Sequence, residues 1–160
     1  MKNFYAMIKK LLFICFTVLS ISCQTSTSNP EIEIVQEDEN LWLKKVEEAM
    51  ILSEETGKPI FAFFTGKVWC HWCKKLESEI LSKEAFLSYA KENLILLELD
   101  FPRGSRNLPK NQIALARKFD VRGYPTVILM DAKANILGKT GYERTSPEGY
   151  VAQIQSMIKH

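Results

Sequence analysis

Apolar residues between positions 41 and 160 follow two different periods, which alternate along the chain. Continuous apolar runs at 60–65 and 94–100 have the length and composition of strands that are buried on both faces. Elsewhere apolar residues recur at helical spacing, with polar turns between the segments. The expected helices span 41–55, 70–90 with a break near 81–82, 111–119, and 147 to about 158.

The last third of the chain predicts a hairpin and a further helix. Residues 126–130 and 136–140 are short strand patterns joined by a tight turn. Ser146 is a favourable N-cap, Pro147 suits the first helical position, and Glu148 places an acid in the first turn. The resulting order, αβαβαββα, predicts an α/β domain, but this periodicity alone specifies no particular fold.

The N-terminal segment has the pattern of an export signal. Lysines at positions 2, 9 and 10 precede an apolar stretch at 11–21. This stretch is too short for a membrane helix, which needs about 20 residues. Residues 1–22 are therefore predicted to be a signal peptide. Residues 20–23, Ser-Ile-Ser-Cys, resemble a bacterial lipobox, so Cys23 is the expected lipidation site. An ordinary cleaved signal with an incidental Cys23, or an uncleaved anchor, is the alternative.

Residues 23–40 are polar and contain acidic but no basic side chains, which is typical of a flexible acidic tether. We expect residues 41–160 to form one domain on the periplasmic or cell-envelope side, with membrane contact only through the lipid. The chain has 21 Lys and Arg against 19 Asp and Glu, without a basic cluster interleaved with aromatic residues. This composition argues against nucleic-acid binding, and no segment suggests anything other than a monomer.

Cysteine usage isolates one pair. Cys15 lies in the predicted signal and Cys23 is the expected lipid site, so only Cys70 and Cys73 remain in the domain. Two thiols three residues apart at a helix start can close a reducible disulfide. Such a dithiol passes electrons through a mixed disulfide with its substrate, so the spacing points to redox chemistry.

Metal binding is the alternative for a pair with this spacing. Zinc usually requires four ligands, and His71 and His160 are badly placed to complete such a site. A c-type haem would require a histidine at position 74, where this chain has Lys74. We therefore expect no metal and no cofactor beyond the dithiol itself.

Three stretches together resemble a known family. They are 61–66, Phe-Ala-Phe-Phe-Thr-Gly; 69–77, Trp-Cys-His-Trp-Cys-Lys-Lys-Leu-Glu; and 121–126, Val-Arg-Gly-Tyr-Pro-Thr. The domain resembles the thioredoxin superfamily, specifically exported thioredoxin-like proteins related to the C-terminal domain of the thiol:disulfide interchange reductase. This resemblance implies a thioredoxin-like fold, with a central mixed sheet flanked by helices and a cis-proline loop.

The resemblance also implies roles for single residues. Cys70 would be the exposed nucleophile, with a thiolate favoured by the helix N-terminus, and Cys73 the more buried resolving thiol. Pro125 would be the cis-proline that faces the dithiol. Tyr124 and Thr126 on either side of it are expected substrate contacts, because the backbone there can pair with an extended chain.

Residues around the cysteines carry further expectations. Trp69 would offer an apolar docking face, Trp72 would contact partners, and His71 would favour the Cys70 thiolate. The alternatives are a core tryptophan at 69 and a solvated histidine at 71. Glu77 matches an acid that lies near the cysteines in the related reductase domain; an exposed glutamate paired with a lysine is its alternative.

Two departures from the family limit what can be carried over. Thioredoxins have a buried aspartate where this chain has Phe64, so proton transfer at Cys73 would rely on Glu77, on water or on no dedicated group. The 101–109 loop, which contains Arg103, is longer than in thioredoxin. Its role stays open between partner choice and a solvated surface.

The function implied is an exported enzyme that reduces disulfides in exported proteins and is itself reduced by a membrane thiol donor. A disulfide oxidase or isomerase is an alternative within the same chemistry. A non-catalytic binding module or a metal-binding protein is an alternative of a different class.

Overall fold

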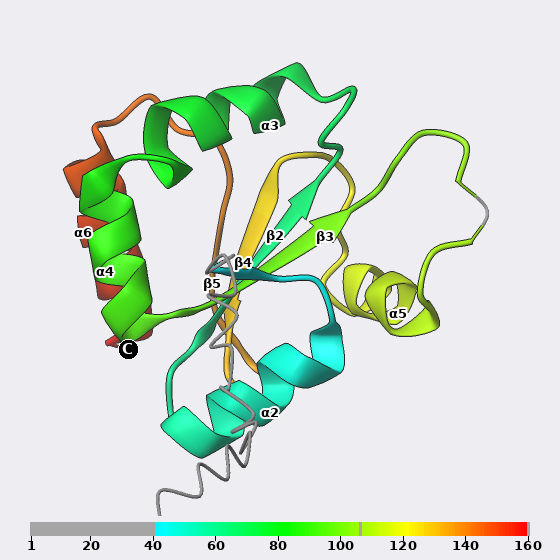
Figure 1. Cartoon of the computed structure of the whole chain (residues 1–160), viewed down its shortest axis with the longest axis horizontal. Coiled ribbons are helices and arrows are strands. Elements are labelled where there is room, and N and C mark those ends of the chain that lie inside the picture. Colours follow the sequence, from blue (N-terminus) through cyan, green and yellow to red (C-terminus); the bar gives the residue numbers. More distant parts are fainter. Residues whose placement is uncertain (1–40, 106, 160) are drawn as a thin grey trace, which may run out of the picture. The chain divides into compact units, whose positions relative to one another are not determined.

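A five-stranded mixed sheet organises the domain in the computed structural model, which describes residues 41–105 and 107–159 (Figure 1). The predicted signal peptide, Cys23, the tether and His160 lie outside the described residues. In chain order the elements are β1 (Trp42–Leu43), α2 (Val46–Thr56), β2 (Ile60–Thr65), α3 (His71–Leu76), the π-helical turn η1 (Glu77–Leu81), α4 (Glu84–Asn93), β3 (Ile95–Asp100), α5 (Lys110–Lys118), β4 (Thr126–Met130), β5 (Ile136–Thr140) and α6 (Pro147–Ile158).

The strand order is β1-β3-β2-β4-β5. Strands β2 and β3 are parallel and are connected through α3, η1 and α4, whereas β4 pairs antiparallel with both β2 and β5. This arrangement confirms the predicted α/β class and the predicted hairpin, and it shows that a helical crossover connects the two parallel strands. The carboxyl end of β2 leads directly into the segment that carries Cys70 and Cys73.

Strand β2 is buried along its whole length and apolar from Ile60 to Phe64, because both faces of the sheet are covered. Phe61 and Phe63 point into a core beneath α3, η1, α4 and α6. Ile60, Ala62 and Phe64 point into a second core beneath α2 and α5. In Figure 1, α4 and α6 lie side by side on one side of the sheet, with α2 and α5 on the other.

The start of the domain differs from the sequence prediction. Instead of a helix from residue 41, Trp42 and Leu43 form β1, which pairs with Leu96 and Leu97 of β3, and the helix begins at Val46. A two-residue strand is too short to show a period of its own. Its placement depends on tertiary packing, since the Trp42 ring contacts the rings of Phe61 and Phe63 at centroid distances of 5.9 Å.

The predicted break in the 70–90 helix is confirmed, and it has a defined form. Helix α3 passes into η1, where the Ser82 N–H donates to the carbonyl of Glu77 five residues earlier. Helix α4 then begins at Glu84. In the part of the chain that the structure describes, no helix combines the length and the apolar character needed to span a bilayer.

Candidate active site

The two cysteines form a disulfide at the start of α3, with their Cα atoms 5.3 Å apart. Cys70 is the N-cap of this helix, with an extended backbone, and its Sγ accepts the Cys73 N–H at 3.1 Å. Free N–H groups at a helix start stabilise negative charge on a sulfur placed there. The cap geometry therefore favours a thiolate at Cys70 once the disulfide is reduced.

Access to the two sulfurs is unequal. Cys70 retains 5% of its surface exposed, whereas Cys73 is completely buried. The predicted order of accessibility agrees with these values. The predicted open exposure of Cys70 does not hold in this disulfide form, because the sulfur is bonded to buried Cys73 and lies over the first turn of the helix. An incoming disulfide can reach Cys70 more readily than Cys73.

The segment before Cys70 is fixed by Trp69. Its indole N–H donates to the carbonyl of Phe101 at 2.9 Å, and its ring meets the Tyr124 ring edge-on at 5.6 Å. The guanidinium of Arg103 lies 4.6 Å from the Trp69 ring centroid. Gly66 provides the space for this ring, since a Cβ there would lie 2.4 Å from Trp69 Cε2. Trp69 thus packs partly into the protein and also connects the 101–109 loop to the cysteines.

The Tyr124–Pro125 peptide bond is cis, as predicted. Tyr124 lies between the rings of Trp69 and Phe101, and burial, followed by the charge of Asp100, raises its pKa. Thr126 is buried at the start of β4 and donates its hydroxyl to the Gly123 carbonyl at 2.8 Å. Its hydroxyl therefore closes the turn before the strand, and a substrate contact by Thr126 stays a prediction.

An open pocket of about 350 Å³, here called the aromatic groove, is lined by Trp72, Tyr124, Pro125, Tyr142 and Arg144. Trp72 is 47% exposed, and its ring lies 5.3 Å from that of Tyr142. Exposed His71 contacts the Trp72 ring at 5.6 Å but does not line the groove. The structure thus brings Trp72, Tyr124 and Pro125 together in one groove, with Trp69 behind Tyr124.

Glu77 lies in a separate cavity of about 440 Å³, which also contains Lys44, Lys67 and Glu98. Glu77 is half-buried, and this burial raises its pKa; the charges of Lys67 and Lys44 oppose that rise, and the charges of Glu98 and Asp100 add to it. Within residues 41–105 and 107–159 Glu77 has no ion pair. The alternative of an exposed glutamate paired with a lysine is therefore wrong.

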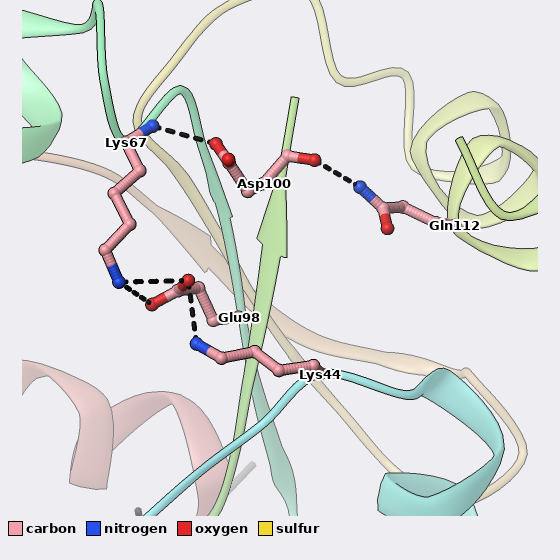
Figure 2. Close-up of polar contacts among 5 residues, drawn as sticks. All are labelled: Lys44, Lys67, Glu98, Asp100 and Gln112. Carbon is pink, nitrogen blue, oxygen red and sulfur yellow. Dashed lines mark hydrogen bonds and ion pairs between the residues drawn. The ribbon is translucent and has the colours of Figure 1, made fainter. Parts of the chain in front are cut away.

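The strand beside this cavity holds the active-site segment in place. Glu98 is 9% exposed and pairs with Lys44 at 2.7 Å and with Lys67 at 3.3 Å (Figure 2). The backbone N–H of Lys67 also donates to Asp100 at 2.8 Å, while the Asp100 carbonyl accepts from the Gln112 side chain at 2.6 Å. Lys67 lies three residues before Cys70, so β3 fixes where α3 begins.

Sequence reasoning missed three residues of this region. Tyr142 and Arg144 follow β5 and reach the groove only because the chain returns beside the cis-proline. Glu98 was hidden in an apolar strand pattern, although a carboxylate inside such a run is itself a signal. Among the described residues, no three His, Cys, Asp or Glu side chains gather in a way that could hold a metal ion.

Comparisons with known proteins agree with this geometry. Residues 46–157 match the thioredoxin-like domain family. The disulfide bond reductase DsbH of Chlamydia pneumoniae is 34% identical over 124 residues, which cover 75% of this chain and 74% of that protein.

Solved structures support the same assignment. A DsbH oxidoreductase has 33% identity and a TM-score of 0.67, over 74% of this chain and 83% of that one. The oxidised C-terminal domain of DsbD from Neisseria meningitidis has 15% identity and a TM-score of 0.52, over 68% of this chain and 89% of that one, which shows a shared fold. The chain belongs to the thioredoxin-like domain family, and its cysteine pair is that of a thiol–disulfide oxidoreductase.

Proposed function

We propose that this protein is an exported reductase that transfers electrons from the Cys70–Cys73 dithiol to disulfides in other exported proteins. One observation carries the proposal: the cysteine pair lies at the start of α3, in a domain whose Tyr124–Pro125 bond is cis, and Cys70 is the less buried of the two cysteines. The direction of electron flow is supported by the likeness to DsbH, whose name describes a disulfide bond reductase.

The reaction proceeds through one mixed disulfide. The Cys70 thiolate attacks one sulfur of the substrate disulfide, that S–S bond breaks, and the released substrate thiolate takes up a proton. Cys73 then loses its proton and attacks the Cys70 sulfur, which expels the second substrate thiolate and closes the Cys70–Cys73 disulfide. Two electrons pass to the substrate, and a thiol donor in the membrane returns the protein to its dithiol form.

Glu77 is the group that we propose as proton acceptor for Cys73. It lies four residues after Cys73 along the same helical segment, with the Glu77 N–H bonded to the Cys73 carbonyl. A carboxyl whose pKa is raised by burial is better matched to a thiol than an ordinary one. Phe64 occupies the position of the family's buried aspartate and lies wholly within the apolar core, so that position supplies no carboxyl for this role.

The location proposed is the outer side of the cytoplasmic membrane, with the domain held by a lipid on Cys23. The signal pattern of residues 1–22, the lipobox-like residues 20–23 and the acidic tether support it. Labelling the full chain with a radioactive fatty acid in a bacterial host tests it. The label should appear in the wild-type protein and be absent from Cys23→Ser; equal labelling of both would contradict the lipid anchor.

Trapping the intermediate tests the enzymatic proposal. In Cys73→Ser the second attack cannot occur, so a disulfide-bonded protein such as insulin should stay covalently attached through Cys70. The attachment should disappear in the double variant that also lacks Cys70. Wild-type protein with a thiol donor should reduce insulin completely. Trapping at Cys73 in place of Cys70, or the absence of insulin reduction, would contradict the proposal.

A further inference from the structure

The aromatic groove has a chemical character that disulfide exchange alone does not require. The neighbouring rings of Trp72 and Tyr142 form an aromatic wall, Tyr124 and Pro125 also line the groove, and Arg144 is its charged lining residue. The Tyr124 phenol is neutral at physiological pH, as an ordinary tyrosine is, and burial raises its pKa further. The groove therefore offers apolar and aromatic surface together with a cation.

The aromatic wall is already ordered without a substrate. The Tyr142 hydroxyl donates to Glu79 at 2.6 Å, and Lys75 pairs with Glu79 at 3.2 Å. The Lys75 ammonium lies 5.7 Å from the centroid of Trp72 and 5.4 Å from that of Tyr142, so it holds both rings. A partner that binds here loses little affinity to the ordering of this wall.

The loop that carries Tyr142 and Arg144 is fixed against the cis-proline. A Cβ on Gly141 would lie 2.9 Å from the Pro125 carbonyl oxygen, which shows how closely the two backbones approach. The hydroxyl of buried Tyr150 donates to the Gly141 carbonyl at 3.0 Å. The backbone at Gly141 is therefore held against the cis-proline loop, and Arg144, three residues later, lines the groove with Pro125.

The charged residues at the groove leave an unmatched positive charge. Hydrogen bonds from Tyr142 and Lys75, and more weakly the charge of Arg144, lower the pKa of Glu79, so this carboxylate is ionised and matched by Lys75. Arg144 is exposed, and among the described residues it forms no ion pair. The charge that the groove leaves available is therefore positive.

We propose that the groove selects substrate segments in which a bulky aromatic or aliphatic side chain and a carboxylate follow the disulfide cysteine. The apolar side chain lies against Trp72 and Tyr142, and the carboxylate pairs with Arg144. A volume of about 350 Å³ leaves room for a large apolar side chain together with a neighbouring acidic one. This inference rests on the proposed reductase function and adds the class of substrate sequence.

Peptide substrates test the selection directly. Each carries one cysteine as a mixed disulfide with thionitrobenzoate, followed by Phe-Glu, Phe-Lys, Ala-Glu or Ala-Lys. The pre-reduced full-length protein reduces this disulfide to two thiols while its dithiol becomes a disulfide, and thionitrobenzoate release gives the rate. An exposed ion pair between Arg144 and the peptide carboxylate should make the Glu peptides react about twofold to fivefold faster than the Lys peptides. The Phe peptides should react faster than the Ala peptides.

Two variants separate the local effect from net charge. Arg144→Glu should reverse the preference to Lys over Glu. Arg117→Glu, which makes the same charge change on the exposed end of α5, should leave the wild-type order intact. Equal rates for Phe-Glu and Phe-Lys in the wild type, or an unchanged order in Arg144→Glu, would overturn the inference. Equal reduction of all four peptides leaves the reductase function standing, whereas no reduction of any peptide contradicts both.

Discussion

Replacing Gly66 by alanine removes the space in which the Trp69 ring lies. The added Cβ would stand 2.4 Å from Cε2 and 2.5 Å from Cζ2 of the indole, well inside contact distance. The ring must therefore move, and the movement breaks its hydrogen bond to Phe101 and its ring contacts with Tyr124 and Arg103.

The cost follows from these contacts. A hydrogen bond is worth about 1 kcal/mol, an aromatic pair about 0.5–1.5 kcal/mol, and an exposed cation–π contact about 0.5–1 kcal/mol. Overpacking of a filled site typically costs about 1–3 kcal/mol. Because these terms overlap, we expect Gly66→Ala to lower the free energy of unfolding by about 2–4 kcal/mol. A domain of this size is stable by about 5–15 kcal/mol, so the variant should still fold.

Urea denaturation of the oxidised protein measures this loss. Gly123→Ala is the matched control, because a Cβ there meets no atom within 4 Å and its backbone does not have a positive φ. The control should change stability by about 0.5 kcal/mol or less. The reasoning is refuted if Gly66→Ala proves as stable as Gly123→Ala, since Trp69 would then have room that the structure denies it.

Three further predictions concern titration and capping. Burial raises the pKa of Glu77 in the folded protein above that of an ordinary glutamate. Between these two pKa values the unfolded chain has lost the carboxyl proton and the folded protein still holds it. The free energy of unfolding therefore falls as the pH rises through this window. Glu77→Gln should therefore gain stability relative to the wild type across that window in urea denaturation from pH 4 to 8; a constant difference would contradict this. Glu98→Gln removes a negative charge that raises the pKa of Glu77, so the pKa of Glu77 should fall. In the pH dependence of the reduction rate, the inflection due to Glu77 should move to lower pH; a move to higher pH would contradict this. Ser146→Ala loses the cap bond to the Gly149 N–H at 3.1 Å and should cost about 0.5–2 kcal/mol in thermal or urea denaturation, whereas Ser156→Ala in the same helix should be nearly neutral.

Elements with strong local signals could be predicted from the sequence. The buried strands were visible as continuous apolar runs, and the cap at Ser146 placed α6 to the residue. Strand β1 could not be predicted, because its two residues are extended only through pairing with β3 and packing on Phe61 and Phe63. Tertiary contact decided the conformation there.

The candidate site shows the same division. The cysteines, Trp72 and Pro125 belong to local motifs and were predicted, including the cis bond. Tyr142 and Arg144 were not predicted as site residues, because they reach the groove only when the β5–α6 loop packs against the cis-proline. The residues for which we propose a role in selectivity therefore emerged from the fold, whereas the cysteine pair and the cis-proline were visible beforehand.

The reduction potential of the Cys70–Cys73 pair tests the central claim most directly. Equilibration of the purified domain with glutathione buffers of known potential, followed by thiol alkylation and mass measurement, yields the value. A reductase fed by a membrane donor predicts a potential near about −270 mV, in the range of thioredoxin. A potential near about −120 mV would contradict the account, because such a pair oxidises the thiols of newly exported proteins.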